Sequence, residues 1–141
     1  MGLRAALADW WRRLLPEKSL GRRGEDAAAR YLKRLGYKIL GRHVVLPSGE
    51  LDLVALDGRT IVFVEVKTRE GDQHGGPSDA VTPAKQRRLT RLAVTFLKRY
   101  GLHDYPARFD VVAIVWPPGG KPRIEHLRNA FDALGRGEFY S

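Results

Sequence analysis

The sequence predicts an α/β domain, in which helices flank a mixed β-sheet that includes a three-stranded antiparallel meander, in the core order α-β-β-β-α-β. Apolar residues recur at helical spacing in residues 19–33 and 82–100. Three segments rich in branched apolar residues lie between these helices, separated by short turns, as is typical of antiparallel strands. A further apolar segment, 108–116, follows the second helix, and a helical crossover of this kind joins parallel strands.

Length and composition fit one domain. The chain has 141 residues, enough to bury a core without covalent staples. It has no cysteine, which excludes disulfides and thiolate catalysis and suits a reducing compartment. No apolar segment reaches the roughly 18 residues of a membrane span, and the basic start lacks the apolar core and cleavage site of a signal peptide. We therefore expect a cytoplasmic protein without a transmembrane segment.

The charge balance favours a polyanionic partner. Twenty-five Lys and Arg residues against 16 Asp and Glu residues give a formal net charge of +9 at pH 7. Each phosphate that a basic side chain neutralises releases counterions and adds salt-dependent affinity, so nucleic acid is the first expectation. A generally basic surface without such a partner is the alternative, and charge alone does not exclude it.

An amphipathic helix is predicted near the start of the chain. Residues 3–15 place leucines and the Trp10-Trp11 pair at helical spacing among arginines, and the pattern ends before Pro16. Packing on the domain, fraying, folding onto a protein partner and lying at a membrane surface are the roles that stay open.

The first core helix is expected to carry an acid on its inner side. Residues 19–33 are followed by Gly36, which is suited to a left-handed C-terminal cap. Steps of three and four residues return to one side of a helix, so Glu25 shares a face with apolar residues. Those residues are Ala28, Leu32 and Leu35. A first-turn glutamate stabilised by the helix dipole, by about 0.3–1 kcal/mol, is an equally open interpretation.

The meander is predicted from strands at 37–46, 51–56 and 61–67. Pro-Ser-Gly at 47–49 turns the first strand into the second. The Asp57-Gly58 pair between the second and third strands is a strong short-range hairpin signal. The stretch from residue 50 to residue 67 is therefore expected to form a tight hairpin, and we take it as the candidate active site.

The register of this hairpin decides which side chains meet. With Asp57-Gly58 as the loop, the ladder pairs Leu56 with Arg59. Continuing it places Asp52 opposite Phe63 and diagonal to Glu65. Diagonal neighbours lie about 7–8 Å apart at the backbone, so two carboxylates leaning inward could hold one cation.

Side-chain alternation adds Lys67 to the face of Asp52 and Glu65. A solvated Glu65–Lys67 salt bridge, worth well under about 1 kcal/mol, is the alternative. Apolar residues occupy both faces of this strand, which predicts burial on both sides. They are Val62, Val64 and Val66 on one face, and Ile61 and Phe63 beside the charges on the other. Charges there are costly to desolvate unless a metal ion or an anionic ligand compensates them.

The second core helix is predicted to begin with Thr82 as N-cap and Pro83 as first residue. The polar, glycine-rich residues 69–81 before it form a loop that could fold over a ligand. Lys85 and Gln86 lean toward the buried side of the helix start, where a phosphate could be received. Several other basic residues fall elsewhere around this helix, as backbone contacts or as a solvated face. They are Arg87, Arg88, Arg91, Lys98 and Arg99.

The C-terminal part is expected to add a last edge strand at 123–127 and a short helical turn at 129–134. The four histidines form no i, i+4 pair, so we expect no zinc site. Neither a dinucleotide-binding GxGxxG loop nor a Walker-type phosphate loop is present.

This order of elements and acids resembles the restriction-endonuclease-like nucleases, whose motif is written PD-(D/E)xK. Asp52 matches the aspartate of the motif, Glu65 its second acid and Lys67 its lysine. Glu50-Leu51-Asp52 replaces the Pro-Asp dipeptide. Glu25 resembles the first-helix glutamate of the Holliday-junction resolvase branch.

Six blocks in order are similar to the YraN-like family of bacterial proteins. They are GRRGEDAAARYL, GELDLVALDG, VFVEVKTR, AVTPAKQRRL, RFDVVAI and HLRNAFD, and they cover about residues 20 to 133. The resemblance implies an N-terminal amphipathic extension (1–18), a nuclease-like domain (19–135) and a tail (136–141).

The resemblance further implies a metal-dependent endonuclease that hydrolyses DNA phosphodiester bonds, on branched or otherwise structured DNA. Its catalytic residues would be Glu25, Asp52, Glu65 and Lys67. Asp52, Glu65 and the Val66 backbone carbonyl would hold one Mg²⁺, with Mn²⁺ as substitute. The nucleic-acid contacts would be Arg22, Arg23, Arg69, Lys85, Gln86, Arg87, Arg88 and Arg91.

Other functions stay open beside the nuclease. One is a non-catalytic nucleic-acid-binding module or an adaptor of a DNA-processing complex. Another is a structural subunit that a protein partner recognises through the helix of residues 3–15. Resolvase-like geometry would also suggest a homodimer.

Overall fold

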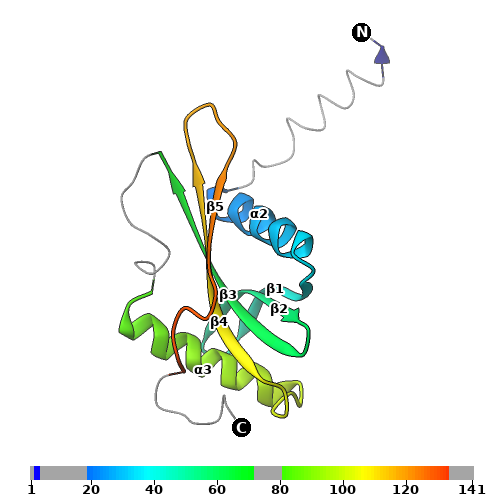
Figure 1. Ribbon diagram of the computed structural model, residues 1–141, viewed down its shortest axis with the longest axis vertical. Coiled ribbons are helices and arrows are strands. Elements are labelled where there is room, and N and C mark those ends of the chain that lie inside the picture. Colours follow the sequence, from blue (N-terminus) through cyan, green and yellow to red (C-terminus); the bar gives the residue numbers. More distant parts are fainter. Residues whose placement is uncertain (1, 4–18, 72–80, 134–141) are drawn as a thin grey trace.

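The computed structural model describes residues 2–3, 19–71 and 81–133, which form a five-stranded sheet with one helix packed on each face (Figure 1). The helices are α2 (Leu20–Arg34) and α3 (Pro83–Arg99). The strands are β1 (Lys38–Leu46), β2 (Gly49–Asp57), β3 (Thr60–Glu70), β4 (Ala107–Trp116) and β5 (Arg123–Leu127).

The sheet follows the order of the chain, β1-β2-β3-β4-β5. The first three strands are antiparallel, β4 runs parallel to β3, and β5 runs antiparallel to β4. The predicted mixed sheet, its meander and the parallel crossover through the second helix are therefore confirmed.

The helices begin where their capping residues predict. Ser19 Oγ accepts a hydrogen bond from the Arg22 N–H (3.2 Å), and Thr82 Oγ1 accepts one from the Lys85 N–H (3.2 Å). Each bond satisfies one of the N–H groups that a first turn leaves unpaired. Gly36 follows α2 with φ 94°, the left-handed conformation expected of it.

The predicted register of the central hairpin is wrong by two residues. Asp57 pairs with Thr60, so the loop is Gly58 and Arg59 rather than Asp57 and Gly58. Gly58 has φ 61° at the first central position, where a tight hairpin turn of the II′ type needs glycine. A shift of two preserves the alternation, so every side chain keeps its predicted face.

The corrected ladder changes the partner of the candidate aspartate. Leu53 pairs with Val64, so the next position places Asp52 across from Glu65 instead of Phe63. The two acids are thus direct cross-strand neighbours rather than diagonal ones, and directly opposed positions are closer at the backbone.

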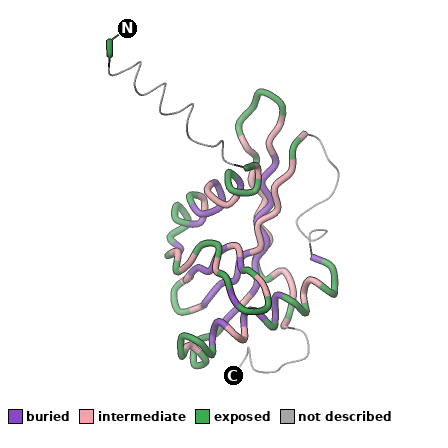
Figure 2. The backbone as a smooth tube through the Cα atoms, turned by 180° about the vertical axis from the view of Figure 1, so that it is seen from behind, coloured by how far each residue is buried: buried purple, intermediate pink, exposed green. Residues whose placement is uncertain are grey.

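The core has two parts, one on each face of the sheet. Figure 2 shows buried residues along the strands and in both helices. Phe63 packs with residues of α3, whereas Val62 and Val64 pack with the alanines of α2. Burial of β3 on both faces is therefore confirmed. Leu35 is 51% exposed, so its predicted place on the inner face of α2 is wrong.

Close packing of α2 on the sheet depends on Gly24. A Cβ atom at this position would overlap the Thr68 side chain of β3. The glycine therefore lets the start of α2 approach β3 closely, and it fixes the height at which the next residue, Glu25, meets the sheet.

Other predictions on the chain ends have mixed outcomes. Residues 129–133 form turns and bends without a helix, so the predicted helical turn is wrong there. The extension, the loop segment 72–80 and the tail fall outside the described residues, except for residues 2–3. Within the described ranges, neither helix is long and apolar enough to cross a membrane.

Candidate active site

Two carboxylates oppose each other across the central hairpin, and a third lies near enough to act on one of them. Glu25 comes from the second turn of α2, Asp52 from β2 and Glu65 from β3. Burial raises the pKa of Asp52 to about 7, and the negative charges of Glu65 and, more weakly, Glu25 act in the same direction. A hydrogen bond from the Val66 N–H to Asp52 Oδ2 (2.8 Å) opposes this shift. The predicted grouping of the two strand acids is thus present in the fold.

Electrostatic crowding distinguishes this group. One backbone donor cannot offset burial together with two nearby anions, so the pKa of Asp52 stays near neutral pH and a substantial fraction of the carboxyl is protonated there. A cation between the acids would relieve the repulsion and restore the ionised form. A strongly perturbed carboxyl with this cause is a functional-site candidate.

A lysine of α3 already contacts one of these acids. Lys85 Nζ lies 2.8 Å from Glu65 Oε1, with the two side chains 29% and 12% exposed. The pattern placed Lys85 correctly on the inward side of the helix start, but as a phosphate contact. The ion pair with Glu65 was not foreseen, because it depends on how α3 crosses the sheet.

The lysine of the motif is placed differently. Lys67 follows Glu65 by two residues on β3, so it lies on the same face by alternation, and it is partly buried. Its ladder partner on β4 is Ala113. Among the described residues it forms no ion pair with Asp52 or Glu65, whereas Lys85 pairs with Glu65.

His43 is a residue of this site that sequence reasoning missed. Arg42 pairs with Leu53 and Val44 with Leu51, so the intervening His43 stands across from Asp52. Its φ of 52° is left-handed, which is uncommon for a residue with a side chain.

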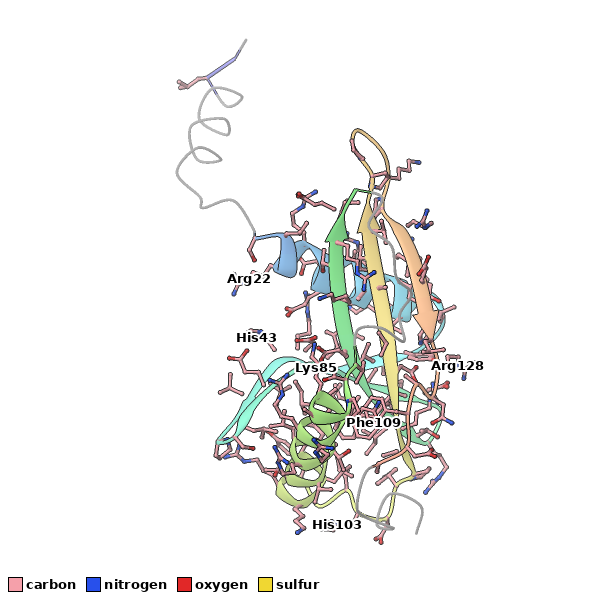
Figure 3. The ribbon with its side chains drawn as sticks, turned by 90° about the vertical axis from the view of Figure 1, so that its left-hand side faces the viewer. Arg22, His43, Lys85, His103, Phe109 and Arg128 are labelled. Carbon is pink, nitrogen blue, oxygen red and sulfur yellow. The ribbon has the colours of Figure 1, made fainter. Side chains whose placement is uncertain are left out.

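The imidazole of His43 bridges two acids. Nδ1 lies 3.8 Å from Glu25 Oε1, and Nε2 lies 3.3 Å from Glu50 Oε2. Figure 3 shows His43 and Arg128 at opposite edges of the view, with Lys85 between them. The only advance signal was the polar interruption around Gly41 in an otherwise apolar strand.

The candidate nucleic-acid contacts are scattered. Gln86 Nε2 donates to the Val81 carbonyl (3.2 Å), which ties it to the start of its own helix. The Arg23 guanidinium stacks over the Trp116 ring at 4.5 Å, away from the acids along β4. Arg69 is partly buried near the end of β3. The remaining arginines are exposed, and they are Arg22, Arg87, Arg88 and Arg91.

The donor set suits a hard, well-hydrated ion. The described residues contain no group of three or more His, Asp or Glu side chains that could hold a metal ion. Asp52 and Glu65 offer carboxylate oxygens to which backbone oxygen and water could be added. Mg²⁺ is usually bound in this way, through one or two carboxylates and several waters, rather than in an all-protein cage.

A second polar cluster lies on the α2 side of the sheet. Asp110 of β4 is fully buried and accepts hydrogen bonds from Arg108 Nε (3.0 Å) and the Asn129 N–H (2.9 Å). His126 Nε2 lies 2.8 Å from its other oxygen, and Tyr31 hydroxyl lies 3.2 Å from His126 Nδ1. This cluster connects α2, β4 and β5.

Every acceptor position of Asp110 is thus engaged. Burial would raise its pKa, but hydrogen bonds from His126, Arg108 and the Asn129 backbone together hold the pKa below its ordinary value. We assign this cluster a structural role, because its anion is already compensated.

The chain is an α/β domain with a mixed five-stranded sheet, and it carries acids on α2 and on the second and third strands. More particularly, the chain belongs to the family described as "Uncharacterised protein family UPF0102", whose model matches residues 24–114. This is the YraN-like family that its sequence blocks resemble.

The chain is similar to members of this family from several bacteria and to a solved structure. A UPF0102 protein of Geobacter sulfurreducens is 53% identical over 115 residues, covering 82% of this chain and 90% of the relative. One of Symbiobacterium thermophilum is 51% identical over 116 residues, covering 82% and 98%. The solved structure of Archaeoglobus fulgidus Hjc, a Holliday junction resolvase from an archaeal hyperthermophile, is 22% identical, with a TM-score of 0.38 and a match that covers 74% of each chain.

Proposed function

We propose that this protein is a metal-dependent nuclease that hydrolyses phosphodiester bonds of DNA, on branched or otherwise structured substrates. The observation that carries the proposal is the placement of the buried Asp52 across from Glu65 and near Glu25, where burial first and then the two negative charges raise the pKa of Asp52 to about 7. Such an arrangement is costly in an empty fold and becomes favourable when a cation binds.

In this proposal Asp52, Glu65 and the Val66 backbone carbonyl hold one Mg²⁺, with Mn²⁺ as a substitute. When bound, the ion would polarise a phosphoryl oxygen and make a coordinated water more acidic. The rest of the chemistry belongs to the side chains of this chain.

Lys67 would orient the attacking water and offset negative charge that builds on the phosphoryl oxygens. Glu25 would accept a hydrogen bond from that water, directly or through a second water. The water oxygen bonds to phosphorus while one ester P–O bond breaks, which yields a phosphate monoester and a free hydroxyl group.

The basic surface supports DNA as the substrate. The net charge is +9, and Arg22, Arg87, Arg88 and Arg91 are exposed on the two helices that flank the sheet. Exposed arginines of this kind would neutralise backbone phosphates, and binding would weaken steeply with salt. We also propose that the protein acts in the cytoplasm as a homodimer and that residues 19–135 form the nuclease-like domain.

Nicking of a branched DNA in Mg²⁺ or Mn²⁺ tests the proposal. Asp52→Ala should abolish cleavage. Lys67→Ala should lower the cleavage rate by about 10²–10³-fold, with DNA affinity changed far less, because its role is in the transition state. Lys33→Ala, which removes one exposed charge at the end of α2, is the matched control. Cleavage that survives both site changes would refute the assignment.

The alternative function is a nucleic-acid-binding module or adaptor without turnover. The Lys85–Glu65 ion pair favours it, because a lysine already compensates one acid. Calorimetric titration with Mn²⁺ separates the two functions. A module predicts salt-dependent DNA binding and no Mn²⁺ binding, or Mn²⁺ binding that Asp52→Ala leaves unchanged.

A role of the first 18 residues in recruiting a protein partner is a separate proposal. It predicts a stable complex that is lost when residues 1–18 are removed, while DNA binding by the remaining chain is retained. Size-exclusion chromatography of both chain lengths, with and without the co-purified partner, checks it.

A further inference from the structure

The ion pair between Lys85 and Glu65 places an internal cation on a carboxylate of the candidate metal site. Lys85 Nζ lies 2.8 Å from Glu65 Oε1, which is a charge-assisted hydrogen-bond distance. Glu65 is only 12% exposed. Water therefore screens this pair less than it screens an ion pair on the surface.

The position of Lys85 runs against local helix preference. It is the third residue of α3, where its N–H bonds to the Thr82 cap, and the first turn of α3 contains no acidic residue. A cation near a helix N-terminus is opposed by the helix dipole, and an acid would be favoured there. The ion pair with Glu65 compensates this local cost, and a residue that breaks a local rule is a candidate for a functional role.

The contacts of Glu65 make the lysine and a metal ion competitors. Glu65 faces Asp52 across the hairpin and raises its pKa, so it is one of the two acids that a divalent ion would engage. A divalent ion at these acids would repel an ammonium group on the same carboxylate at short range. The Lys85 ammonium group and a divalent ion therefore weaken each other's binding to the Glu65 carboxylate.

We propose that Lys85 is a positioning residue that occupies Glu65 in the DNA-free protein, weakens metal binding there, and moves to a DNA phosphate when substrate arrives. This inference rests on the proposed function and adds a regulation to it. Substrate and metal then favour each other, because each removes the competitor of the other, and such coupling is reciprocal. The nuclease would carry little metal until DNA is present.

Mn²⁺ affinity of the DNA-free protein, measured by calorimetry, is the decisive readout. Lys85→Met should bind Mn²⁺ roughly five- to fiftyfold more tightly than the unmodified protein, because the internal competitor is gone. Lys85→Gln serves as a second variant, and Lys85→Arg, which retains the charge, should stay close to the unmodified protein. Thermal melting of each variant verifies that it is folded.

A matched control removes the general effect of charge. Arg88→Met deletes one positive charge from the same helix at an exposed position. It should change Mn²⁺ affinity by less than about twofold, since exposed charges are screened. Equal gains in Lys85→Met and Arg88→Met would mean that net charge, and not the pair with Glu65, sets the affinity.

The coupling between metal binding and DNA binding is measured as DNA affinity with and without Ca²⁺, an ion that prefers oxygen ligands. The unmodified protein should bind a branched DNA more tightly when Ca²⁺ is present, and Lys85→Met should lose part of that gain. Unchanged or weaker Mn²⁺ binding by folded Lys85→Met overturns the inference alone. Absent Mn²⁺ binding by both the unmodified protein and folded Lys85→Met, or binding that Asp52→Ala leaves unaffected, overturns the proposed function.

Discussion

Asp52 and Asp110 sit in the same sheet, yet their surroundings have opposite effects. Asp110 has no exposed side-chain surface, and its pKa is lowered, because Arg108, His126 and a backbone N–H all donate to it or pair with it. Asp52 is less buried. Burial and the negative charges of Glu65 and Glu25 raise its pKa to about 7, and the single hydrogen bond from the Val66 N–H does not offset them.

The contrast teaches that the depth of burial does not identify a site. A deeply buried anion with every acceptor position filled belongs to the fold. A partly buried acid with a single donor and like charges nearby is a candidate for binding a cation. The two clusters should therefore respond in opposite directions when their acids are removed.

Asp110→Ala should give the largest loss of stability. It leaves His126 and Arg108 Nε without their acceptor in the interior, while Arg108 keeps its pair with Asp57, and the loss of the buried anion costs about 3–5 kcal/mol of the free energy of unfolding. Urea unfolding at neutral pH measures this loss. A loss no greater than that of an exposed substitution would contradict the structural role of the cluster.

Asp52→Asn should have the opposite sign. It retains an acceptor for the Val66 N–H and removes a charge that is unfavourable in the fold, so it should stabilise the DNA-free protein by about 1–3 kcal/mol above pH 7. The same variant should lose metal-dependent cleavage.

The pH dependence of this difference follows from the raised pKa of Asp52. The preference of the fold for the neutral carboxyl stabilises fully below the unfolded pKa of 3.8, and this contribution is lost as pH rises through about 7. The gap between Asp52→Asn and the unmodified protein should therefore open between those two values. Equal stability of both proteins at every pH would show that Asp52 is not perturbed.

Gly24→Ala should disturb the candidate active site and leave the Asp110 cluster in place. The added methyl group overlaps the Thr68 side chain, so the start of α2 must move, at a cost of about 1–3 kcal/mol. Glu25 would move with it, and cleavage should fall.

Gly21→Ala is the matched control, because its Cβ would meet only Ser19 Oγ at 4.0 Å. This substitution should be neutral or slightly stabilising, since alanine is the better helix former. Thr68→Ala should partly restore the stability that Gly24→Ala loses. If thermal melting shows neither the loss in Gly24→Ala nor its rescue by Thr68→Ala, the close approach of α2 to β3 is contradicted.

Metal affinity should show the smallest of these effects. An ion at Asp52 displaces a proton while the carboxyl is neutral, so Mn²⁺ affinity should rise about tenfold between about pH 6 and pH 8 and then level off. Calorimetry in buffers of different ionisation enthalpy should detect proton release. A flat profile would separate Mn²⁺ binding from Asp52.

Much of the fold could be predicted because it depends on local sequence patterns. Capping residues located both helix starts, and alternation placed the strand acids on one face. The hairpin loop was misplaced because Asp57-Gly58 is a good turn signal, whereas the turn uses glycine one position earlier within its central pair. The register error was two residues, so each side chain stayed on its predicted face of the sheet.

The contacts that were missed depend on distances between elements. The pair of Lys85 with Glu65 follows from the placement of α3 on the sheet, and the position of His43 follows from a left-handed residue in β1. The Asp110 cluster joins residues far apart in the chain, such as Tyr31 and His126. Periodicity reports which side a residue faces, and it does not report what stands opposite.

The residues after β5 have a practical consequence for any shortened form of the protein. The Asn129 N–H donates to Asp110, and the Phe131 ring stacks on Phe109 with centroids 4.4 Å apart. A chain that ends at Leu127 would thus lack one hydrogen-bond donor to the buried Asp110 and would expose the Phe109 ring. Expression boundaries at the C-terminal end should therefore lie beyond residue 133, however much of residues 1–18 is trimmed.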